Sequence, residues 1–454
     1  MRCDVVVLGA GPAGLAAAAV ASGAGRSVTV VDLGARPGGQ FYRHRPDGSP
    51  TPGQHGWSTF ATLRDTCVAR GVRMLAGHQV FLVEPGPWFT VHTDHGTLTA
   101  DAVVIATGAH DRPLPFPGWD LPGVLTPGGA QAVLKGNGVV PGKRIVVSGT
   151  GPFLLPVAAG LAQAGAEVAG VFEANDPARF AGFPATVARN ADKLAEAAGY
   201  LAVLARHRVP VRNRHLVVAA HGHEAVEAVT VAKVDADWRP IEGTGRRIDC
   251  DVVAVGCGFV PQIDIGTALG CATDLAADGA VVLRVDGRQA TSVPGVFAAG
   301  EVTGIGGARL SLVEGAIAGL AVSGVDDPSR WARLRAERAR HTAFARALAA
   351  VYPVRDGWLR NLAGDTVLCR CEEVDHDAVG AAVTGLGARD ARAVKLLTRA
   401  GMGWCQGRMC GSAVAGVVAD LTGTSSDSTT MTRRILAQPV RLGDLADDNP
   451  EELR

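Results

Sequence analysis

The sequence predicts an α/β fold with two Rossmann-like dinucleotide-binding units in series, followed by a small helical domain at the C-terminal end. Three observations lead to this prediction. An apolar strand, a G-x-G-x-x-G turn and an alanine-rich helix occupy residues 3–22. A similar strand, glycine turn and helix recur within residues 143–173, and four of the nine cysteines lie within residues 369–410. Apolar strands without polar alternation are typical of parallel sheets covered on both faces.

Composition excludes several classes of protein. The 454 residues include 44 Lys plus Arg and 44 Asp plus Glu, so the formal charge is zero, which argues against electrostatic capture of nucleic acid. With 47% hydrophobic and 19% charged residues, the chain can form large cores and is too apolar for disorder. Nine cysteines in so long a chain do not make a secreted disulfide scaffold.

Two uncharged stretches, residues 5–25 and 145–166, are long enough to span a bilayer, which needs about 20 apolar residues. Each is interrupted near its start by Gly-x-Gly-Pro, as a strand, a turn and a buried helix would be. Only Arg2 supplies basic charge before the first stretch, which argues against a signal peptide. We expect a cytoplasmic protein that is neither an integral membrane protein nor a nucleic-acid-binding protein.

The first glycine turn has the pattern that a dinucleotide phosphate requires. Its first glycine makes the turn, the second lets the backbone approach a pyrophosphate, and the third lets helix and strand pack closely. The helix N-terminus would bind the phosphates, and Asp32, at the end of the next strand, can accept from a ribose hydroxyl. The alternative is a turn without a ligand. The candidate residues of the turn are Gly9, Gly11, Pro12, Ala13 and Gly14.

The second turn differs from the first. It contains Gly149 and Gly151, but Leu154 replaces the third glycine, so helix and strand cannot pack as closely. The following strand ends at Glu173, which favours an unphosphorylated ribose and hence NAD over NADP. A working nucleotide site and a purely structural unit are both compatible with this pattern.

Further short strands are expected between and after the two units. The last of them ends at Glu301 and precedes an alanine-rich helix. They lie at residues 79–83, 89–92, 102–108, 216–219, 228–234, 251–256 and 295–301.

These motifs resemble those of two-dinucleotide-binding-domain flavoproteins, the thioredoxin-reductase-like and pyridine nucleotide–disulfide-reductase-like enzymes. The resemblance covers about residues 1–325 and rests on the glycine turns and on residues 37–40, 106–108 and 298–301. It implies FAD in the first unit. Asp32 and Glu301 stand where the family usually has Glu and Asp, so a bare adenine nucleotide is the alternative ligand. The other residues that the resemblance places near FAD are Gly39, Gln40, Val80, Thr107, Gly108 and Gly300.

The first 325 residues lack the closely spaced cysteine pair of a disulfide reductase. We therefore expect five buried structural thiols rather than a dithiol site. They are Cys3, Cys67, Cys250, Cys257 and Cys271.

A C-x-C pair and a C-x4-C pair predict a metal centre at Cys369, Cys371, Cys405 and Cys410. Disulfides would need tight loops, and structural zinc prefers C-x2–4-C pairs; both stay as alternatives. A [2Fe-2S] cluster needs four thiolates around two irons. Neighbouring glycine N–H groups, two arginines and the N-termini of helices expected near residues 374 and 411 would offset its charge. These neighbours are Gly401, Gly403, Gly407, Arg370 and Arg408.

This segment resembles the bacterioferritin-associated-ferredoxin-like [2Fe-2S] domain at all four cysteines and along residues 401–410. With the flavin fold and the tail at residues 439–446, nearly the whole chain is similar to α subunits of heteromeric amino-acid dehydrogenases. That family includes hydrogen cyanide synthase, opine oxidase, D-hydroxyproline dehydrogenase and related sarcosine-oxidase-type complexes. The resemblance implies an electron-transfer subunit of an FAD-dependent oxidoreductase acting on CH–NH or CH–NH2 donors.

The same resemblance implies a glycine-oxidase-like β subunit that carries the amino-acid substrate site and its own flavin. A small ferredoxin-like subunit, a second flavin (FMN) at a subunit interface, and NAD or ATP in a nucleotide site are further expectations. Residues 110–112 could border the flavin or form an ordinary loop, so the catalytic residues are unknown. The rival interpretations are a self-contained NADH-dependent flavin and iron–sulfur reductase and a non-enzymatic iron-sensing or assembly partner.

A charged helix at residues 326–351, with Trp331, Leu334 and Phe344 on a docking stripe, is interpreted as a connector. The predicted domains are an FAD-binding domain (1–115 and 285–325), a second dinucleotide-binding domain (116–284), a helical connector (326–362), a [2Fe-2S] domain (363–425) and a C-terminal tail (426–454).

Overall fold

The computed structural model describes residues 2–51, 54–426 and 434–446. These residues form two compact units. The first unit contains residues 2–110, 260–347 and 434–446, and the second contains residues 111–259 and 348–426. The chain passes between the units within β7 (Ala109–Asp111), β16 (Phe259–Pro261) and α9 (Pro328–Val351).

A seven-stranded sheet forms the centre of the first unit within the described residues. Its order is β3-β2-β1-β6-β5-β4, and β19 pairs with β6. The central strand β1 is parallel to both of its neighbours, as the sequence predicts. The strands are β1 (Arg2–Leu8), β2 (Val28–Asp32), β3 (Arg73–Ala76), β4 (Val80–Glu84), β5 (Phe89–Thr93), β6 (Gly96–Ile105) and β19 (Val296–Ala298).

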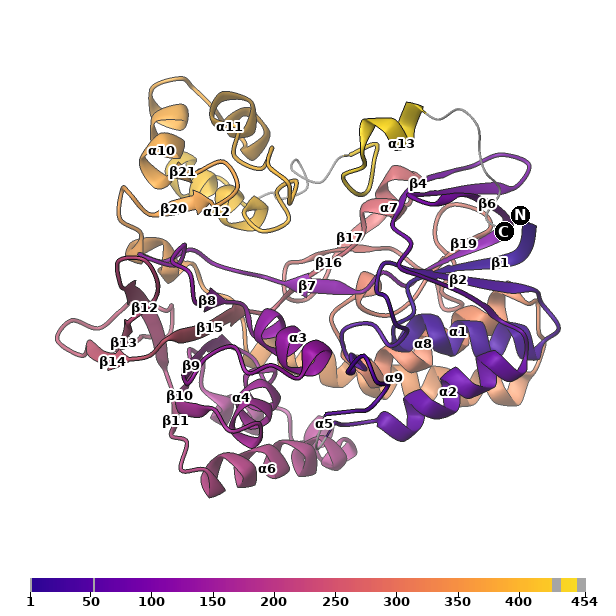
Figure 1. The fold of residues 1–454 in the computed structure, drawn as a ribbon, viewed down its shortest axis with the longest axis horizontal. Helices are drawn as coiled ribbons and strands as arrows, with labels where there is room; N and C mark the ends of the chain where they lie inside the picture. Colours follow the sequence, from indigo (N-terminus) through magenta and orange to yellow (C-terminus); the bar gives the residue numbers. More distant parts are fainter. Residues whose placement is uncertain (1, 52–53, 427–433, 447–454) are drawn as a thin grey trace. The chain divides into compact units, whose positions relative to one another are not determined.

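Strand β1 is buried on both faces because its side chains alternate between two cores. Val5 and Val7 pack with the alanine-rich helix α1 (Pro12–Gly23), whereas Val6 and Leu8 pack with β4 and β5. Helices α1 and α8 (Ala308–Val322) lie side by side on one face of the sheet (Figure 1). This close packing requires Gly315, because a Cβ there would lie 2.1 Å from the carbonyl oxygen of Ala13.

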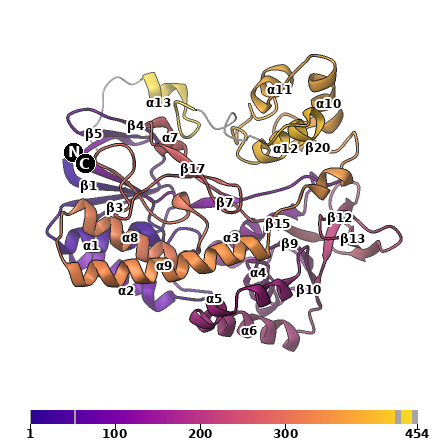
Figure 2. The same ribbon diagram turned by 180° about the vertical axis from the view of Figure 1, so that it is seen from behind.

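Helix α9 confirms the predicted charged helix at residues 326–351. Trp331 and Leu334 are buried against α8, and Phe344 is half-buried. Figure 2 shows the part of α9 that belongs to the first unit running beside α8. The remaining elements of this unit are α2 (Trp57–Ala69), α7 (Asp264–Ala268), β17 (Thr273–Leu275), β18 (Val281–Leu283), the 3-10 helix at Glu301–Thr303 and α13 (Leu442–Ala446).

Residues 260–284 pack within the first unit, not within the second dinucleotide-binding domain in which the sequence places them. Ile263, Ile265 and Leu269 are buried in the same core as Val83 and Leu98 of the large sheet. This segment packs in the first unit because its apolar side chains are buried in the core of that unit.

A parallel five-stranded sheet, ordered β11-β10-β9-β15-β8, forms the centre of the second unit within the described residues. A separate antiparallel sheet contains β12, β13 and β14. The strands are β8 (Val124–Leu125), β9 (Arg144–Thr150), β10 (Glu167–Glu173), β11 (Val211–Asn213), β12 (His215–His221), β13 (Ala228–Lys233), β14 (Arg246–Asp249) and β15 (Val252–Cys257). The helices are α3 (Pro127–Asn137), α4 (Leu154–Gln163), the 3-10 helix at Pro177–Gly182, α5 (Pro184–Arg189) and α6 (Ala191–Arg206).

A small helical domain completes the second unit. Its core is continuous with that of the second dinucleotide-binding domain, because Trp358 and Leu368 are buried in one cluster with Leu216 and Trp238. Its elements are the 3-10 helix at Asp356–Asn361, β20 (Val367–Cys369), β21 (Val374–Asp375), α10 (His376–Thr384), α11 (Ala391–Thr398) and α12 (Gly411–Thr422).

Candidate cofactor sites

At two positions of the first glycine turn, neighbouring backbone atoms leave no room for a side chain. A Cβ on Gly9, whose φ is +108°, would lie 2.3 Å from the carbonyl oxygen of Ala106, and a Cβ on Gly14 would lie 1.8 Å from that of Gly9. Gly11 is different, because nothing lies within 4 Å of the position of its Cβ. Pro12 begins α1 directly after Gly11, so the helix N-terminus faces this open space and can bind a pyrophosphate.

Asp32 ends β2 beside this turn. Its two carboxylate oxygens accept hydrogen bonds from the N–H of Ala10 at 2.5 Å and of Gly34 at 2.6 Å. Burial raises the pKa of this carboxyl, and the two backbone donors lower it. Leu33 is 62% exposed and Gly34 is also exposed, so the chain leaves this side of the carboxylate open to a ribose.

Separate segments converge on the first turn. A Cβ on Gly39 would lie 2.9 Å from Cα of Gly11, and a Cβ on Gly300 would lie 2.9 Å from Cβ of Ala13. Gly39 and Gly300 have φ values of +58° and +81°, which favour glycine. The structure therefore brings together residues that the sequence assigned to one cofactor from positions 9–14, 32, 39 and 300.

The remaining predicted residues of this site have identified contacts of their own. Thr107 donates its hydroxyl to the carbonyl oxygen of Gln262 at 2.6 Å, and Gly108 has a φ of +74°. Gln40 accepts from Arg43 at 2.8 Å and is exposed. Val80 begins β4 and is half-buried at the edge of the core.

Glu301 is directed at the loop before α8. Its carboxylate accepts from the N–H of Gly306 at 3.2 Å and of Gly307 at 2.8 Å, and burial raises its pKa to about 7. It therefore fixes the backbone that leads into α8.

The buried Glu314 and the half-buried Arg338 are two residues of this site that sequence reasoning missed. One Glu314 oxygen accepts from the N–H of Gly300 at 3.0 Å and from the hydroxyl of Thr303 at 2.9 Å. Its other oxygen pairs with Nε of Arg338 on α9 at 3.1 Å. The available signal was a lone carboxylate in the apolar helix that follows residues 298–301. These residues hold the Gly300 loop against α1.

The donor set of the first unit fits FAD. An open helix N-terminus, a carboxylate beside it and two glycines packed against the turn supply what a dinucleotide needs. Gly9, Gly11 and Gly14 would hold the pyrophosphate, Asp32 the ribose, and Gly39 and Gly300 the approach to the rest of the cofactor.

The second glycine turn is built differently. A Cβ on Gly149 would lie 1.8 Å from the carbonyl oxygen of Gly256 on the neighbouring strand, so the backbone is equally close-packed at this turn. However, α4 begins only at Leu154, and the N–H of Gly151 donates to Glu173 at 2.8 Å. Glu173 is 5% exposed, and burial raises its pKa to about 7.

The four predicted cluster cysteines lie together. Their thiols form a hydrogen-bonded series, Cys369 to Cys410, Cys410 to Cys405 and Cys405 to Cys371. Cys369 ends β20 and Cys410 precedes α12, and both are buried, whereas Cys405 is half-buried and Cys371 is exposed. Each sequence pair therefore combines a buried sulfur with a more accessible one.

Hydrogen bonds keep two of these sulfurs in the thiolate form that binds metal. The Cys410 thiol lowers the pKa of Cys369 to about 6. The pKa of Cys405 is lowered to about 4, mainly by Cys410 and also by backbone N–H groups. The pKa of Cys410 is raised because it donates to both. Burial raises the pKa of Cys371.

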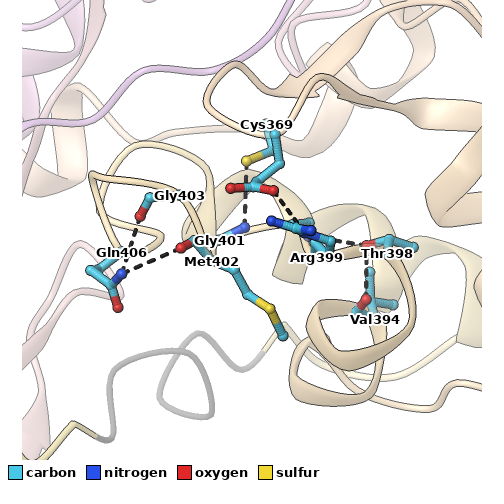
Figure 3. Close-up of polar contacts among 10 residues, drawn as sticks. Cys369, Val394, Thr398, Arg399, Gly401, Met402, Gly403 and Gln406 are labelled. Carbon is cyan, nitrogen blue, oxygen red and sulfur yellow. Dashed lines mark hydrogen bonds and ion pairs between the residues drawn. The ribbon is translucent and has the colours of Figure 1, made fainter.

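Glycines shape the loop around these sulfurs. Figure 3 shows the N–H of Gly401 directed at Sγ of Cys369, 3.4 Å away. A Cβ on Gly403 would lie 2.2 Å from that of Cys371, and the Gln406 amide donates to the carbonyl oxygen of Gly403 at 3.2 Å. Four thiols and an N–H donor fit the chemistry of a [2Fe-2S] cluster. Residues 369, 371, 405 and 410 would hold it.

The charges near the cysteines follow the sequence prediction in part. Arg408 donates to the carbonyl oxygen of Cys405 at 3.3 Å, and α12 begins directly after Cys410. Helix α10 begins at His376, and the side chain of Asp375 caps it by accepting from Ala378 at 2.8 Å. Its N-terminus is thus partly satisfied within the helix.

Arg370, between the first two cysteines, docks the cluster domain on its neighbour. Its guanidinium donates to the carbonyl oxygen of Asp120 at 3.0 Å and lies over the Trp119 ring, 4.9 Å from the centroid. The indole N–H of Trp119 donates to the carbonyl oxygen of Val367. Trp119 had no motif to mark it, and only the folded chain shows its role.

The other candidate residues serve structure. The five remaining cysteines are buried and free, as expected. Asp111 accepts from the N–H of Gly128 at 2.9 Å, and Arg112 donates to the carbonyl oxygen of Phe259 at 3.1 Å.

Two negative findings hold for the described part of the chain. Within residues 2–51, 54–426 and 434–446, no three or more His, Cys, Asp or Glu side chains converge on one point as ligands of a single metal ion, and the four cysteines lie in a series of pairs instead. No helix in these same ranges has the length and apolar character needed to cross a membrane.

Comparisons with known proteins agree with the two cofactor regions. The model of the pyridine nucleotide-disulphide oxidoreductase family matches residues 3–319, and that of the BFD-like [2Fe-2S] binding domain matches residues 367–420. The chain is 31% identical to hydrogen cyanide synthase subunit HcnB of Pseudomonas protegens, over 90% of each chain. It is 32% identical to an opine oxidase subunit of Rhizobium meliloti strain 1021, over 98% of each chain.

A solved structure extends this likeness to the fold. The L-proline dehydrogenase chain from P. horikoshii matches with a TM-score of 0.68 and 22% identity, over 98% of this chain and 80% of that one. The chain therefore belongs to the pyridine nucleotide-disulphide oxidoreductase family, in the group with a BFD-like [2Fe-2S] domain that includes hydrogen cyanide synthase subunit HcnB and the matching opine oxidase subunit.

Proposed function

We propose that this chain is the electron-transfer α subunit of a heteromeric flavin-dependent amino-acid dehydrogenase and passes electrons between FAD and a [2Fe-2S] cluster. The observation that carries the proposal is the presence of two redox-cofactor regions in one chain, the first glycine turn and the four cysteines. When bound, a flavin exchanges two electrons with a substrate and one with a cluster, which carries one at a time.

The residues of this chain would position both groups. Glu314 and Arg338 hold the Gly300 loop, while Arg370 and Trp119 hold the segment between Cys369 and Cys371 against the second dinucleotide-binding domain. The cysteine thiolates and the Gly401 N–H would bind and tune the cluster.

The substrate site is assigned to a separate polypeptide. We infer a glycine-oxidase-like β subunit with its own flavin, because Asp111 and Arg112 are engaged in structural contacts with Gly128 and Phe259. Glycine, sarcosine, proline-like compounds and opines are the candidate substrates. FMN at the subunit interface, a small ferredoxin-like subunit and a cytoplasmic location belong to the same proposal.

Anaerobic mixing tests this division of labour. The purified chain, loaded with both cofactors, is mixed with each candidate amino acid alone and again with the β subunit. We expect flavin bleaching only when the β subunit is present. Rapid bleaching of the isolated chain by an amino acid would overturn the proposal, and rapid bleaching by NADH would favour the NADH-dependent reductase instead.

A further inference from the structure

The two dinucleotide-binding units of this chain differ most at the acid that would meet a ribose. In the first unit, Asp32 is followed by Leu33, which is 62% exposed. In the second unit, Glu173 is followed by Ala174 and Asn175, which are 2% and 5% exposed. The same position is therefore open in one unit and covered in the other.

Glu173 already accepts three hydrogen bonds from its own turn. It accepts from the hydroxyl of Thr150 at 2.9 Å and from the N–H groups of Gly151 and Asn175, each at 2.8 Å. Asp32 accepts two such bonds. The Gly151 N–H is thus used within the chain.

Asn175 ties the second turn to the end of the connector. Its amide donates to Oγ1 of Thr150 at 2.7 Å and to the carbonyl oxygen of Pro353 at 3.0 Å. Its side-chain oxygen accepts from the indole of Trp238 at 3.4 Å, and Trp238 is 1% exposed. A buried amide with three partners fixes the segment around Pro353 in place.

Tyr352 covers the same position. Its ring contacts that of Phe180 edge-on, with centroids 5.9 Å apart. Burial raises the pKa of Tyr352, and so does the nearby carboxylate of Glu173. The Gly151 Cβ position has nothing within 4 Å, so the turn itself is open, in contrast to the covered position beside Glu173.

The segment that follows Pro353 packs against the second dinucleotide-binding domain as it enters the cluster domain. The N–H of Gly357 donates to the carbonyl oxygen of Asp237 at 2.9 Å. Ala174 and Trp238 are buried in one core with Trp358 and Cys369.

We propose that the second unit does not bind a dinucleotide: Asn175, Tyr352 and Pro353 fill its ribose position, and their contacts instead anchor the connector that carries the [2Fe-2S]-binding domain. This inference does not depend on the proposed function. The family's nicotinamide cofactor does not fit the second turn of this chain, because Asn175 and Tyr352 cover the carboxylate that would bind its ribose, and the Gly151 N–H is paired with that carboxylate.

Hydrogen exchange of the full chain, loaded with both cofactors, tests the first half of the proposal. Amide exchange at Gly151, Asn175 and Gly357 is measured alone and with excess NADH, NADP+ or ATP. We expect no saturable change at these amides with any nucleotide. Slower exchange at Gly151 or Asn175 in the presence of a nucleotide would overturn the proposal, and this readout is separate from flavin reduction.

Substitutions test the anchoring role. Asn175→Ala removes the bond to Pro353, and we expect exchange at Gly357 to become about tenfold faster, the effect of losing one buried hydrogen bond. Tyr352→Ala should act in the same direction, whereas Tyr352→Phe keeps the ring contact and should act less. Asn213→Ala, on exposed β11, is the matched control. Unchanged exchange at Gly357 in both Asn175→Ala and Tyr352→Ala would overturn the anchoring role. Should one variant not fold, the other and the nucleotide arms still decide.

Discussion

Asp32 and Glu173, the two carboxylates at the ends of β2 and β10, differ in whether a ligand can reach them. Asp32 is held by two backbone donors and leaves room for a ligand, whereas Glu173 is enclosed and has a pKa of about 7. The difference arises from the residues that follow each acid. Leu33 is exposed, and Asn175 is buried.

The raised pKa of Glu173 predicts a dependence of stability on pH. Between its ordinary value of 4.5 and about 7, the folded chain holds a proton that the unfolded chain releases. The stabilisation that this proton contributes is therefore fully present below pH 4.5 and is lost as the pH rises to about 7. The loss lowers the free energy of unfolding by about 3 kcal/mol. Glu173→Gln should flatten this part of the curve, measured by urea unfolding at several pH values. Glu301→Gln is the comparison and should flatten the curve in the same way, because the pKa of Glu301 is also about 7. An unchanged slope in Glu173→Gln would contradict the assignment.

The cysteines predict a selective loss of the cluster. Cys410→Ser should remove the visible absorbance and EPR signal of the cluster and leave flavin binding intact, because Cys410 contacts both Cys369 and Cys405. Cys271→Ser is the control, since that thiol already bonds the hydroxyl of Thr291 at 3.4 Å. Retention of the full cluster signal by Cys410→Ser would show that the centre uses other ligands.

At the scale of elements, the contact between β1 and α1 depends on one glycine. A Cβ on Gly14 would lie 1.8 Å from the backbone oxygen of Gly9, so Gly14→Ala should displace the turn and abolish FAD binding. Gly160→Ala, within α4, meets only Leu134 at 3.7 Å and should stabilise the helix by up to about 1 kcal/mol. Flavin content and thermal unfolding measure both effects. Normal FAD content in Gly14→Ala would refute this account of the turn.

The link between α8 and α9 predicts a second effect on flavin binding. Arg338→Met leaves Glu314 buried without its cation, which should lower the free energy of unfolding by about 2 kcal/mol, since Arg338 is itself 25% exposed. FAD affinity should fall as the Gly300 loop loosens. Arg333→Met, at an exposed position of the same helix, should change neither quantity. Equal FAD affinity in the two variants would contradict the role of this ion pair.

The elements predicted correctly from sequence are those with strong local signals. The G-x-G-x-x-G turn, the apolar strands β1 and β9 and the charged helix α9 each follow from a short pattern. Residues 260–284 lack such a pattern, and their placement depends on which core Ile263 and Leu269 join. The boundaries of the connector likewise depend on which core its side chains join.

At the scale of the whole molecule, the residues that sequence reasoning missed are those that join distant segments. Asn175 meets Pro353 across 178 positions of the sequence, and Arg370 meets Asp120 across 250. The amino-acid sequence alone contains no periodic pattern that would predict such pairs. The four cysteines were predictable because metal ligands recur at characteristic spacings, whereas their contacts with the second dinucleotide-binding domain were not.

Anaerobic photoreduction followed by low-temperature EPR measures whether electrons pass from the flavin to the cluster within one chain. The full chain is purified without oxygen, its flavin is reduced by light with EDTA as the sacrificial electron donor, and the cluster signal is recorded together with the iron and zinc content. We expect bound iron. We also expect the reduced-cluster signal to grow as the reduced flavin passes its electrons to the cluster and reoxidises. Zinc in place of iron, or flavin reduction with no cluster signal, would contradict it.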